Sequence, residues 1–370
     1  MQESLPVFNS MSEIAEYLGI TKVSVSLALK NSPLISDELR KQVQQLARAT
    51  GFSPRKYRKQ TGDSSARDPV ALCFDPKLQS DPVAQELLSS MMQRLKELRI
   101  PFELVSNQEL EKSDGALAGF SGVIFHYATP PELTRRFATL PQIFIMKEDT
   151  NVTAVDIYKP NELIAGKLAA DYLIRQGFRE LLLIWEKKWT YNPSEHMRLE
   201  GFRRQACMHH IKVRELGYDQ SESLEPFSNE LLKNLEEVNR HAGIFAFNDQ
   251  IAFTTCIILN MLGVERKKGE LELISCDNTH LLRSLTPVPP AIDLHHGELA
   301  RRAVDGLLWR IRNPNALPQE VLLFPELVER DSSGEERRSG VSASVEPAHF
   351  GVDCVTPKEN KNRKRRWYDK

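Results

Sequence analysis

The central part of the chain, residues 69–331, alternates short apolar runs with longer amphipathic stretches. The apolar runs have the length of buried strands, and they are Val70–Phe74, Phe102–Val105, Gly122–Phe125, Gln142–Met146, Leu181–Trp185, Gly243–Phe247 and Leu271–Cys276. The amphipathic stretches repeat apolar residues at helical spacing, and they are Val83–Leu98, Leu163–Gln176, Met197–His209, Glu230–Arg240 and Gln250–Leu262. This alternation predicts an α/β domain of parallel sheets flanked by helices.

Residues 1–54 have a different, all-helical pattern. Ser10 and Glu13 fit a capping box, and the apolar residues that follow recur at helical spacing until Gly19, which is expected to end the helix with a positive φ. Thr21 and Ser36 are suited to cap a second and a third helix. Short helices joined by a tight glycine turn predict a helix-turn-helix head.

Segments of both parts resemble one protein family. Residues 11–31, then Pro33–Ser36 and Gly51–Pro54, are similar to the head of the lactose-repressor (LacI/GalR) class of bacterial transcription regulators. In the body, five further segments follow in the family's order, up to about residue 333: Asp156 with Ala169–Leu181, then Arg198–Phe202, Phe245–Asp249, Ile274–Asn278 and Pro325–Ser332.

The resemblance implies a DNA-binding head, a hinge over residues 55–68, and a two-lobed sensor over residues 69–331 that is similar to periplasmic sugar-binding proteins. It places residues 69–157 and about 288–315 in the first lobe. Residues 158–287 and 316–331 are expected in the second lobe.

The start of the second helix is the expected DNA-reading surface, because such a helix lies in the major groove. Lys22 can donate to guanine, and Val23 can pack on a thymine methyl group. The hydroxyls of Thr21, Ser26 and Ser36 are expected to contact phosphates, although the same residues also suit simple helix caps.

Leu27 stands where the family usually carries an arginine. We expect the loss of a bidentate guanine contact there, which is about 1–3 kcal/mol of preference at one base pair.

The hinge also departs from the family, which usually places a leucine there that wedges into the minor groove. The position of that leucine is Thr61 in this chain, and a threonine is too short and polar to separate two base pairs. Four basic residues precede it: Arg55, Lys56, Arg58 and Lys59. They predict binding to phosphates with a steep salt dependence and little bending of the DNA, and Tyr57 is the alternative wedge.

Candidate effector-binding residues end strands or begin helices in the body: Asp75, Trp185, Arg198, Asn248, Asp249 and Asp277. Carboxylates, an amide and a guanidinium around an aromatic face suit a polyhydroxylated, carbohydrate-like ligand. The family resemblance assigns the effector to the positions of Arg198, Asn248 or Asp249, and Asp277. The alternative is that Asn248 and Asp249 cap the next helix and that Asp277 caps a turn.

Charge is distributed unevenly although the net charge is only −1. Residues 1–60 carry nine Lys and Arg against five Asp and Glu, which suits contact with a polyanion. Residues 332–370 form a polar, basic tail without apolar periodicity, so we expect it to be disordered. Either additional nonspecific DNA affinity or a merely solvated extension would fit this tail.

Enzymatic and metal-binding motifs are absent from the sequence. There is no phosphate-binding Gly-rich loop, no nucleophile elbow and no His-Glu-x-x-His, and the five cysteines contain no Cys-x-x-Cys pair. The adjacent pairs His209-His210 and His295-His296 make poor chelates. We expect no catalytic activity, no cofactor and no metal.

The sequence as a whole predicts a homodimeric, sequence-specific regulator, most simply a repressor, that binds a near-palindromic operator in double-stranded DNA. A small carbohydrate-like effector between the lobes is expected to control it. No apolar run reaches the roughly 18 residues of a membrane span, and no signal peptide is recognisable, so we expect a cytoplasmic, nucleoid-associated protein. The alternative is a ligand-binding protein or enzyme with a vestigial head.

Overall fold

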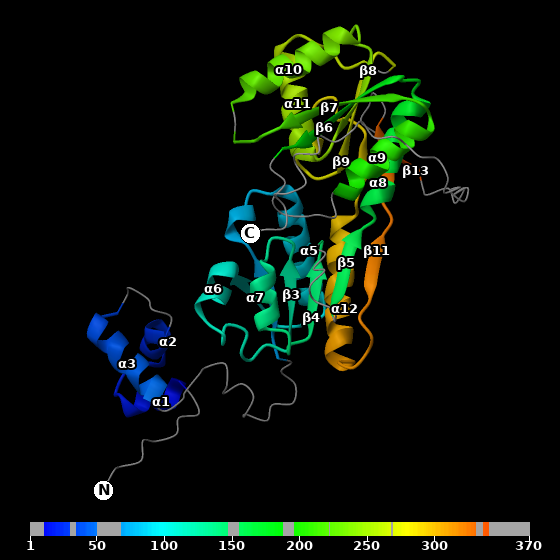
Figure 1. The fold of residues 1–370 in the computed structure, drawn as a ribbon. Coiled ribbons are helices and arrows are strands. Elements are labelled where there is room, and N and C mark those ends of the chain that lie inside the picture. Colours follow the sequence, from blue (N-terminus) through cyan, green and yellow to red (C-terminus); the bar gives the residue numbers. More distant parts are fainter. Residues whose placement is uncertain are drawn as a thin grey trace, which may run out of the picture.

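The computed structural model describes residues 11–29, 35–49, 68–146, 155–187, 196–221, 223–267, 269–330 and 336–339. It confirms the predicted class: an all-helical head is followed by two α/β lobes (Figure 1). Within these residues no helix is both long and apolar enough to cross a bilayer.

Three helices make up the head: α1 (Met11–Tyr17), α2 (Lys22–Leu29) and α3 (Asp37–Ala49). Gly19 has φ 66°, as the turn between α1 and α2 requires. Its small core contains the buried residues Ile14, Ala15, Val25, Ala28 and Val43.

The first lobe is built on a six-stranded sheet in the order β11-β5-β4-β3-β1-β2. All its strand pairs are parallel. The strands are β1 (Val70–Phe74), β2 (Phe102–Ser106), β3 (Gly122–His126), β4 (Gln142–Ile145), β5 (Asp156–Pro160) and β11 (Glu320–Leu323). The helices are η1 (Pro76–Leu78), α5 (Pro82–Glu97), α6 (Asn107–Lys112), α7 (Pro131–Arg136) and α12 (His296–Arg312). One apolar cluster lies under α5 and α12, and a second lies under α6 and α7, so both faces of the sheet are covered.

The second lobe is built on a seven-stranded sheet in the order β13-β12-β10-β9-β8-β6-β7. The strands are β6 (Glu180–Glu186), β7 (Lys212–Tyr218), β8 (Ala242–Ala246), β9 (Leu271–Asp277), β10 (Ala291–Asp293), β12 (Glu326–Arg330) and β13 (Glu336–Ser339). The helices are α8 (Glu162–Arg175), α9 (His196–Met208), α10 (Leu224–Glu237), α11 (Asp249–Met261) and η3 (Leu282–Ser284). Among the described strands of this sheet, β12 pairs antiparallel with both β10 and β13, and the other pairs are parallel.

Two glycines bring α8 and α9 into close contact. A Cβ at Gly166 would lie 1.8 Å from the carbonyl oxygen of Arg198, and a Cβ at Gly201 would lie 2.0 Å from that of Leu163. The backbone contact therefore fixes Arg198 against the start of α8.

The chain passes between the lobes three times, from β5 to α8, from β10 to α12 and from β11 to β12. The predicted lobe boundaries are wrong at two strands. β10 lies in residues expected in the first lobe but pairs with β9 in the second sheet. β11 lies in residues expected in the second lobe but pairs with β5 in the first sheet.

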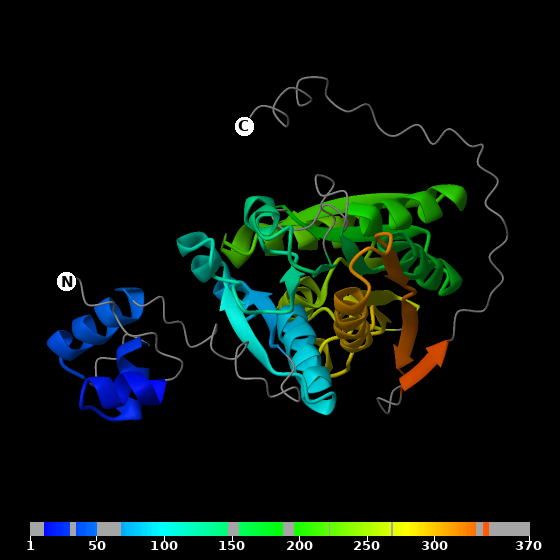
Figure 2. The ribbon, with the colours of Figure 1, turned by 90° about the horizontal axis from the view of Figure 1, so that it is seen from below.

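The predicted boundary of the tail is also wrong. β13, at residues 336–339, pairs with β12 in antiparallel register, so the ordered sensor extends past residue 332 (Figure 2, orange-red). Polar side chains hide this strand from a periodicity argument, since backbone pairing at a sheet edge does not require apolar residues. The predicted disorder of residues 340–370 lies outside the described residues.

Candidate ligand pocket and DNA-binding head

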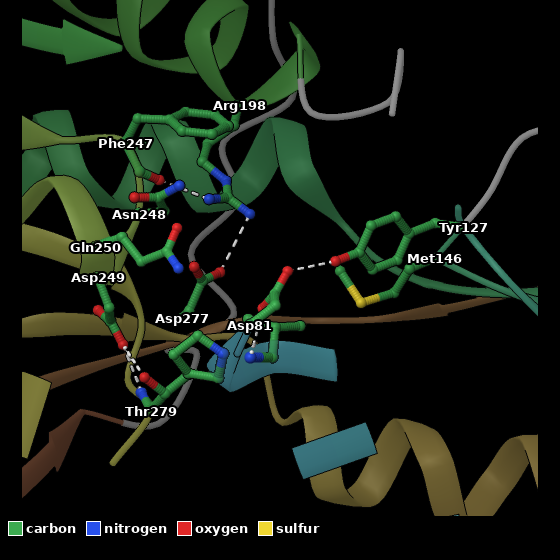
Figure 3. Close-up of a pocket in the computed structure, with 12 residues that line it drawn as sticks. Asp81, Tyr127, Met146, Arg198, Phe247, Asn248, Asp249, Gln250, Asp277 and Thr279 are labelled. Carbon is green, nitrogen blue, oxygen red and sulfur yellow. Dashed lines mark hydrogen bonds and ion pairs between the residues drawn. The ribbon is translucent and has the colours of Figure 1, made fainter. Parts of the chain in front are cut away.

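A pocket of about 60 Å³ opens between the lobes at the carboxyl ends of the strands (Figure 3). Its first-lobe side is formed by Asp81, Pro82, Val83, Tyr127 and Met146. Its second-lobe side is formed by Arg198, Phe247, Asn248, Asp249, Gln250, Asp277 and Thr279. Four predicted effector residues therefore meet in one cavity: Arg198, Asn248, Asp249 and Asp277.

Arg198 is buried at the second-lobe wall and is 2 % exposed. Its Nε and Nη2 donate to the two carboxylate oxygens of Glu162, at 2.7 and 3.1 Å. Nη1 donates to the carbonyl oxygen of Phe247 at 2.6 Å, and Nη2 lies 3.4 Å from Oδ1 of Asp277. The guanidinium carbon is also 4.6 Å from the centre of the Phe247 ring. Arg198 thus joins α8, α9 and the ends of β8 and β9.

Asp277 ends β9 with φ 100°, a backbone conformation that is strained for a side-chain-bearing residue. Its Oδ1 also lies 3.5 Å from Nε2 of the buried His296, which begins α12. Burial acts to raise the pKa of the Asp277 carboxyl, but Arg198 and His296 outweigh burial and hold the pKa below its usual value. Asp277 is therefore an ionised group between the two lobes.

Asp249 begins α11 and is buried behind the pocket. Its carboxylate accepts from the hydroxyl of Ser275 at 2.6 Å, and from the backbone N–H and the hydroxyl of Thr279 at 2.5 and 2.8 Å. Burial, and then the charge of Asp277, raise the pKa of Asp249 to about 7. Asp249 anchors the loop that follows Asp277.

Asn248 accepts from the backbone N–H of Ile251 at 2.9 Å, so its side chain caps α11, as the capping alternative predicted. The same residue still lines the pocket.

The first-lobe wall was not anticipated from the sequence. Asp81 caps α5 by accepting from the N–H groups of Val83 and Ala84, at 2.8 and 3.3 Å. Its second oxygen accepts from the hydroxyl of Tyr127 at 2.5 Å. The sequence does hold a signal for Asp81, because an aspartate directly before a proline is typical of a helix start.

Two predicted effector residues do not line this pocket. Asp75 caps η1 through the N–H of Lys77 and accepts from Asn107 at 3.4 Å. Trp185 is half-buried against the apolar cluster of the second lobe. Both lie near strand ends, as expected, but their side chains have structural contacts elsewhere.

In the head, Thr21 and Ser36 both cap helices. The Thr21 hydroxyl accepts from the N–H of Ser24 at 3.0 Å, and the Ser36 hydroxyl accepts from the N–H of Leu39 at 3.4 Å. Both residues stay exposed, and Leu27 of α2 is only half-buried. The side chains of Lys22, Val23 and Ser26, and all of Arg55, Lys56 and Tyr57, lie outside the described part of the chain.

No cluster of three or more potential metal ligands exists among the described residues. The adjacent pair His295-His296 diverges: His296 contacts Asp277, whereas His295 lies 3.6 Å from Asp293 and 3.9 Å from Glu326.

The fold and the pocket define the chain as a two-lobed, binding-protein-like sensor joined to a helical head. Residues 170–333 match the family model of the periplasmic binding protein-like domain. The transcriptional regulator DegA of Bacillus subtilis is 24% identical over 335 residues, which cover 87% of this chain and 97% of that protein. The ribose operon repressor of Escherichia coli is 26% identical over 205 residues, and the match spans only 60% of its length.

Solved structures share this architecture. A lac repressor dimer bound to operator and the anti-inducer ONPF has a TM-score of 0.61 at 15% identity, over 88% of this chain and 99% of that one. The complex of the transcriptional regulator CelR with cellobiose has a TM-score of 0.59 at 19% identity, over 87% and 99% of the two chains. These matches bear out the predicted resemblance to the LacI/GalR family: the matched domain is periplasmic binding protein-like, the similar proteins are named as transcription regulators, and a lac repressor shares the fold.

Proposed function

We propose that this regulator is a homodimeric repressor that binds operator DNA through its heads and takes up a hydroxylated, carbohydrate-like effector between its lobes. The observation that carries this proposal is the pocket itself, whose walls come from both lobes (Figure 3). A ligand that touches Asp81 on one wall and Asp277 on the other binds one lobe arrangement better than any other. That difference in affinity is what a small molecule needs in order to change operator binding.

The chemistry of the walls favours a ligand with several hydroxyl groups. The lining offers carboxylates, amides and a phenol together with the Phe247 and Tyr127 rings, which suits donors and acceptors around an apolar face. The bound ligands named for similar structures are cellobiose for CelR and ribose for a regulator from Enterococcus faecium.

The homodimer is supported by exposed apolar residues on α11 and just after it. Ile257, Met261 and Leu262 are 37 %, 79 % and 39 % exposed. Burial of such a patch against a second copy removes apolar surface from water and gives two heads for two operator half-sites.

The head supplies the DNA contacts in this proposal. Base edges are read from α2, by Lys22 and Val23 at its start and by Leu27 one turn later. Phosphates are contacted by Thr21, Ser26 and Ser36. Arg55, Lys56 and Tyr57 act from the hinge, which holds the protein near phosphates by charge.

Selection of DNA fragments from a genomic pool tests the proposal. The full chain should retain a small set of fragments with a near-palindromic core, and Lys22→Ala should weaken binding to them at least about tenfold, the worth of one good base contact. Titration of simple sugars against the selected fragment should then find one that releases it. Retention of random fragments alone, with the same salt dependence for every sequence, would support the alternative of a ligand-binding protein with a vestigial head.

A further inference from the structure

The groups in the pocket that could hold an anion are already bound by the protein's own carboxylates. Arg198 is the one cationic side chain among the described lining residues, and four of its five N–H donors are engaged by Glu162, Asp277 and the carbonyl of Phe247. A ligand phosphate would have to displace Glu162, which is 4 % exposed and pairs with Arg198 through both oxygens. The guanidinium is therefore not available as an anion site.

The two helices that begin at the pocket are closed to anions in the same way. The N–H groups at a helix start are a common phosphate site. At α5 these groups are taken by the Asp81 carboxylate, and the first helical residue is Pro82, which has no N–H. At α11 the Asn248 side chain holds the N–H of Ile251, and Asp249 occupies the first turn.

The balance of charge points in the same direction. Three carboxylates, those of Asp81, Asp249 and Asp277, belong to the lining against one cation, Arg198, which Glu162 already pairs. Asp249 is turned to Ser275 and Thr279, and Asp277 contacts the buried His296, so Asp81 is the remaining lining carboxylate, and its described contacts include no cation. Glu186, at the end of β6, adds to this field. Its pKa is raised by burial first and then by the charges of Asp219 and Asp81, so negative charge approaches the cavity from both lobes.

We propose that this pocket selects against anions: the effector is a hydroxylated molecule that is uncharged or carries an amine, and a phosphorylated or carboxylated analogue is rejected. Asp81 sets this discrimination. Its described partners are two backbone N–H groups and the Tyr127 hydroxyl, none of them a cation, so its charge is left to act on the ligand. This inference rests on the proposed function only in taking this pocket as the effector site.

Thiol labelling inside the pocket measures the discrimination without any effector or DNA. Gln250 lines the cavity and is half-buried, so Gln250→Cys places a thiol there. The probes are three methanethiosulfonates of similar size that carry a 2-aminoethyl, a 2-hydroxyethyl or a 2-sulfonatoethyl group. The thiolate attacks the sulfenyl sulfur, a mixed disulfide forms, and methanesulfinate leaves with the bonding electron pair.

The full chain is labelled at pH 8, above the pKa of about 7 of Asp249, and the peptide that contains residue 250 is quantified by mass spectrometry. Gln93→Cys on the exposed side of α5 corrects for the intrinsic reactivity of each probe, and the unsubstituted chain gives the background of the native cysteines. Any effect of the pocket on the pKa of the new thiol is common to the three probes and cancels in the ratio of rates.

We expect the anionic probe to react at least about tenfold more slowly than the neutral one after correction, and the cationic probe to react fastest, since a charged cleft changes local ion concentration by about 10 to 10³. Asp81→Asn keeps the helix cap and removes the charge, so it should narrow the anion-to-cation ratio at least threefold. Equal corrected rates for the three probes would overturn the inference. An unchanged ratio in Asp81→Asn would overturn the role of Asp81.

A second measurement uses thermal shifts with glucose, glucosamine and glucose 6-phosphate. Stronger stabilisation by the phosphate ester than by glucose also overturns the inference. The labelling rates do not depend on DNA, so they still test the inference if no operator is selected. If an operator is selected but the three probes react at equal corrected rates, the proposed function stands and the selection against anions is contradicted.

Discussion

Two buried arginines, one in each lobe, pair with a carboxylate in the same forked geometry. Arg310 in the first lobe donates Nε and Nη2 to Asp156 at 2.9 and 2.6 Å, as Arg198 in the second lobe does to Glu162. Their remaining partners differ. Arg310 also donates to the backbone carbonyls of Ala316 and Leu317, whereas Arg198 reaches the ionised Asp277 at the pocket.

This difference separates a structural ion pair from a functional one. The Arg310 pair ties the loop after α12 to β5, and neither Arg310 nor Asp156 lines the pocket. The Arg198 pair continues through Asp277 to His296 on α12, which packs in the first lobe. Arg198 therefore lies in a series of charged groups that spans both lobes. A change in the arrangement of the lobes alters the charges around Arg198.

The largest effect is expected when the structural pair is broken. Arg310→Met leaves the carboxylate of Asp156, which is fully buried, without its cation, and this should lower the free energy of unfolding by about 3–5 kcal/mol. Urea denaturation followed by circular dichroism measures the loss. Arg302→Met is the matched control, since Arg302 lies on the same helix but makes an exposed pair with Glu298 that contributes less than about 0.5 kcal/mol. Equal decreases in the free energy of unfolding of Arg310→Met and Arg302→Met would contradict a structural role of Arg310.

Breaking the pair of Arg198 with Glu162 should lower the free energy of unfolding less than breaking the Arg310 pair, but it should abolish the response to the ligand. Arg198→Met leaves Glu162 at the start of α8, where the helix dipole favours a carboxylate, and leaves Asp277 with His296. We expect a loss of about 2–3 kcal/mol, together with loss of the ligand's effect on operator binding. The double variant Arg198→Met with Glu162→Gln should recover part of the stability and none of the ligand response. Full ligand response in the double variant would show that Arg198 acts only through packing.

Sequence patterns predicted the central strands and the head helices because these are short apolar segments between clear helix and turn signals. They did not predict strands with mixed side chains at the sheet edges, such as β7 and β13, where backbone pairing decides the structure. They also missed Glu162, because its partner lies 36 residues away and only the close approach of α8 and α9 brings the two together. For the same reason, the sequence suggested a free guanidinium for the ligand, whereas the structure shows one already paired.

The pH dependence of stability tests the charge cluster at the pocket. Burial raises the pKa of Asp249 in the folded chain to about 7, above its ordinary value. Protonation of the Asp249 carboxyl therefore stabilises the folded chain relative to the unfolded chain. The stabilisation is complete below about pH 4 and is lost as pH rises through about 7. Asp249→Asn should remove this slope, so the difference in unfolding free energy between the two chains should change by about 1 kcal/mol or more between pH 5 and pH 8. Parallel curves over that range would indicate that Asp249 is ionised throughout.

The smallest effect is expected at a third, more exposed arginine, where the chain passes between the lobes. Arg338 of β13 lies 3.1 Å from Asp293 and 3.3 Å from Glu326, and its side chain is 44 % exposed. Water screens such pairs, so Arg338→Ala should lower the free energy of unfolding by no more than about 1 kcal/mol, and 1 M salt should reduce the difference further. Urea denaturation at low and high salt measures both. We expect the losses to fall in the order Arg310, Arg198, Arg338, because the buried Asp156 is left without a cation, Glu162 and Asp277 keep other favourable contacts, and water reaches the partners of Arg338. A decrease of more than about 2 kcal/mol in the free energy of unfolding of Arg338→Ala, unchanged by salt, would contradict that order. It would indicate that β13 stabilises the segments that connect the two lobes.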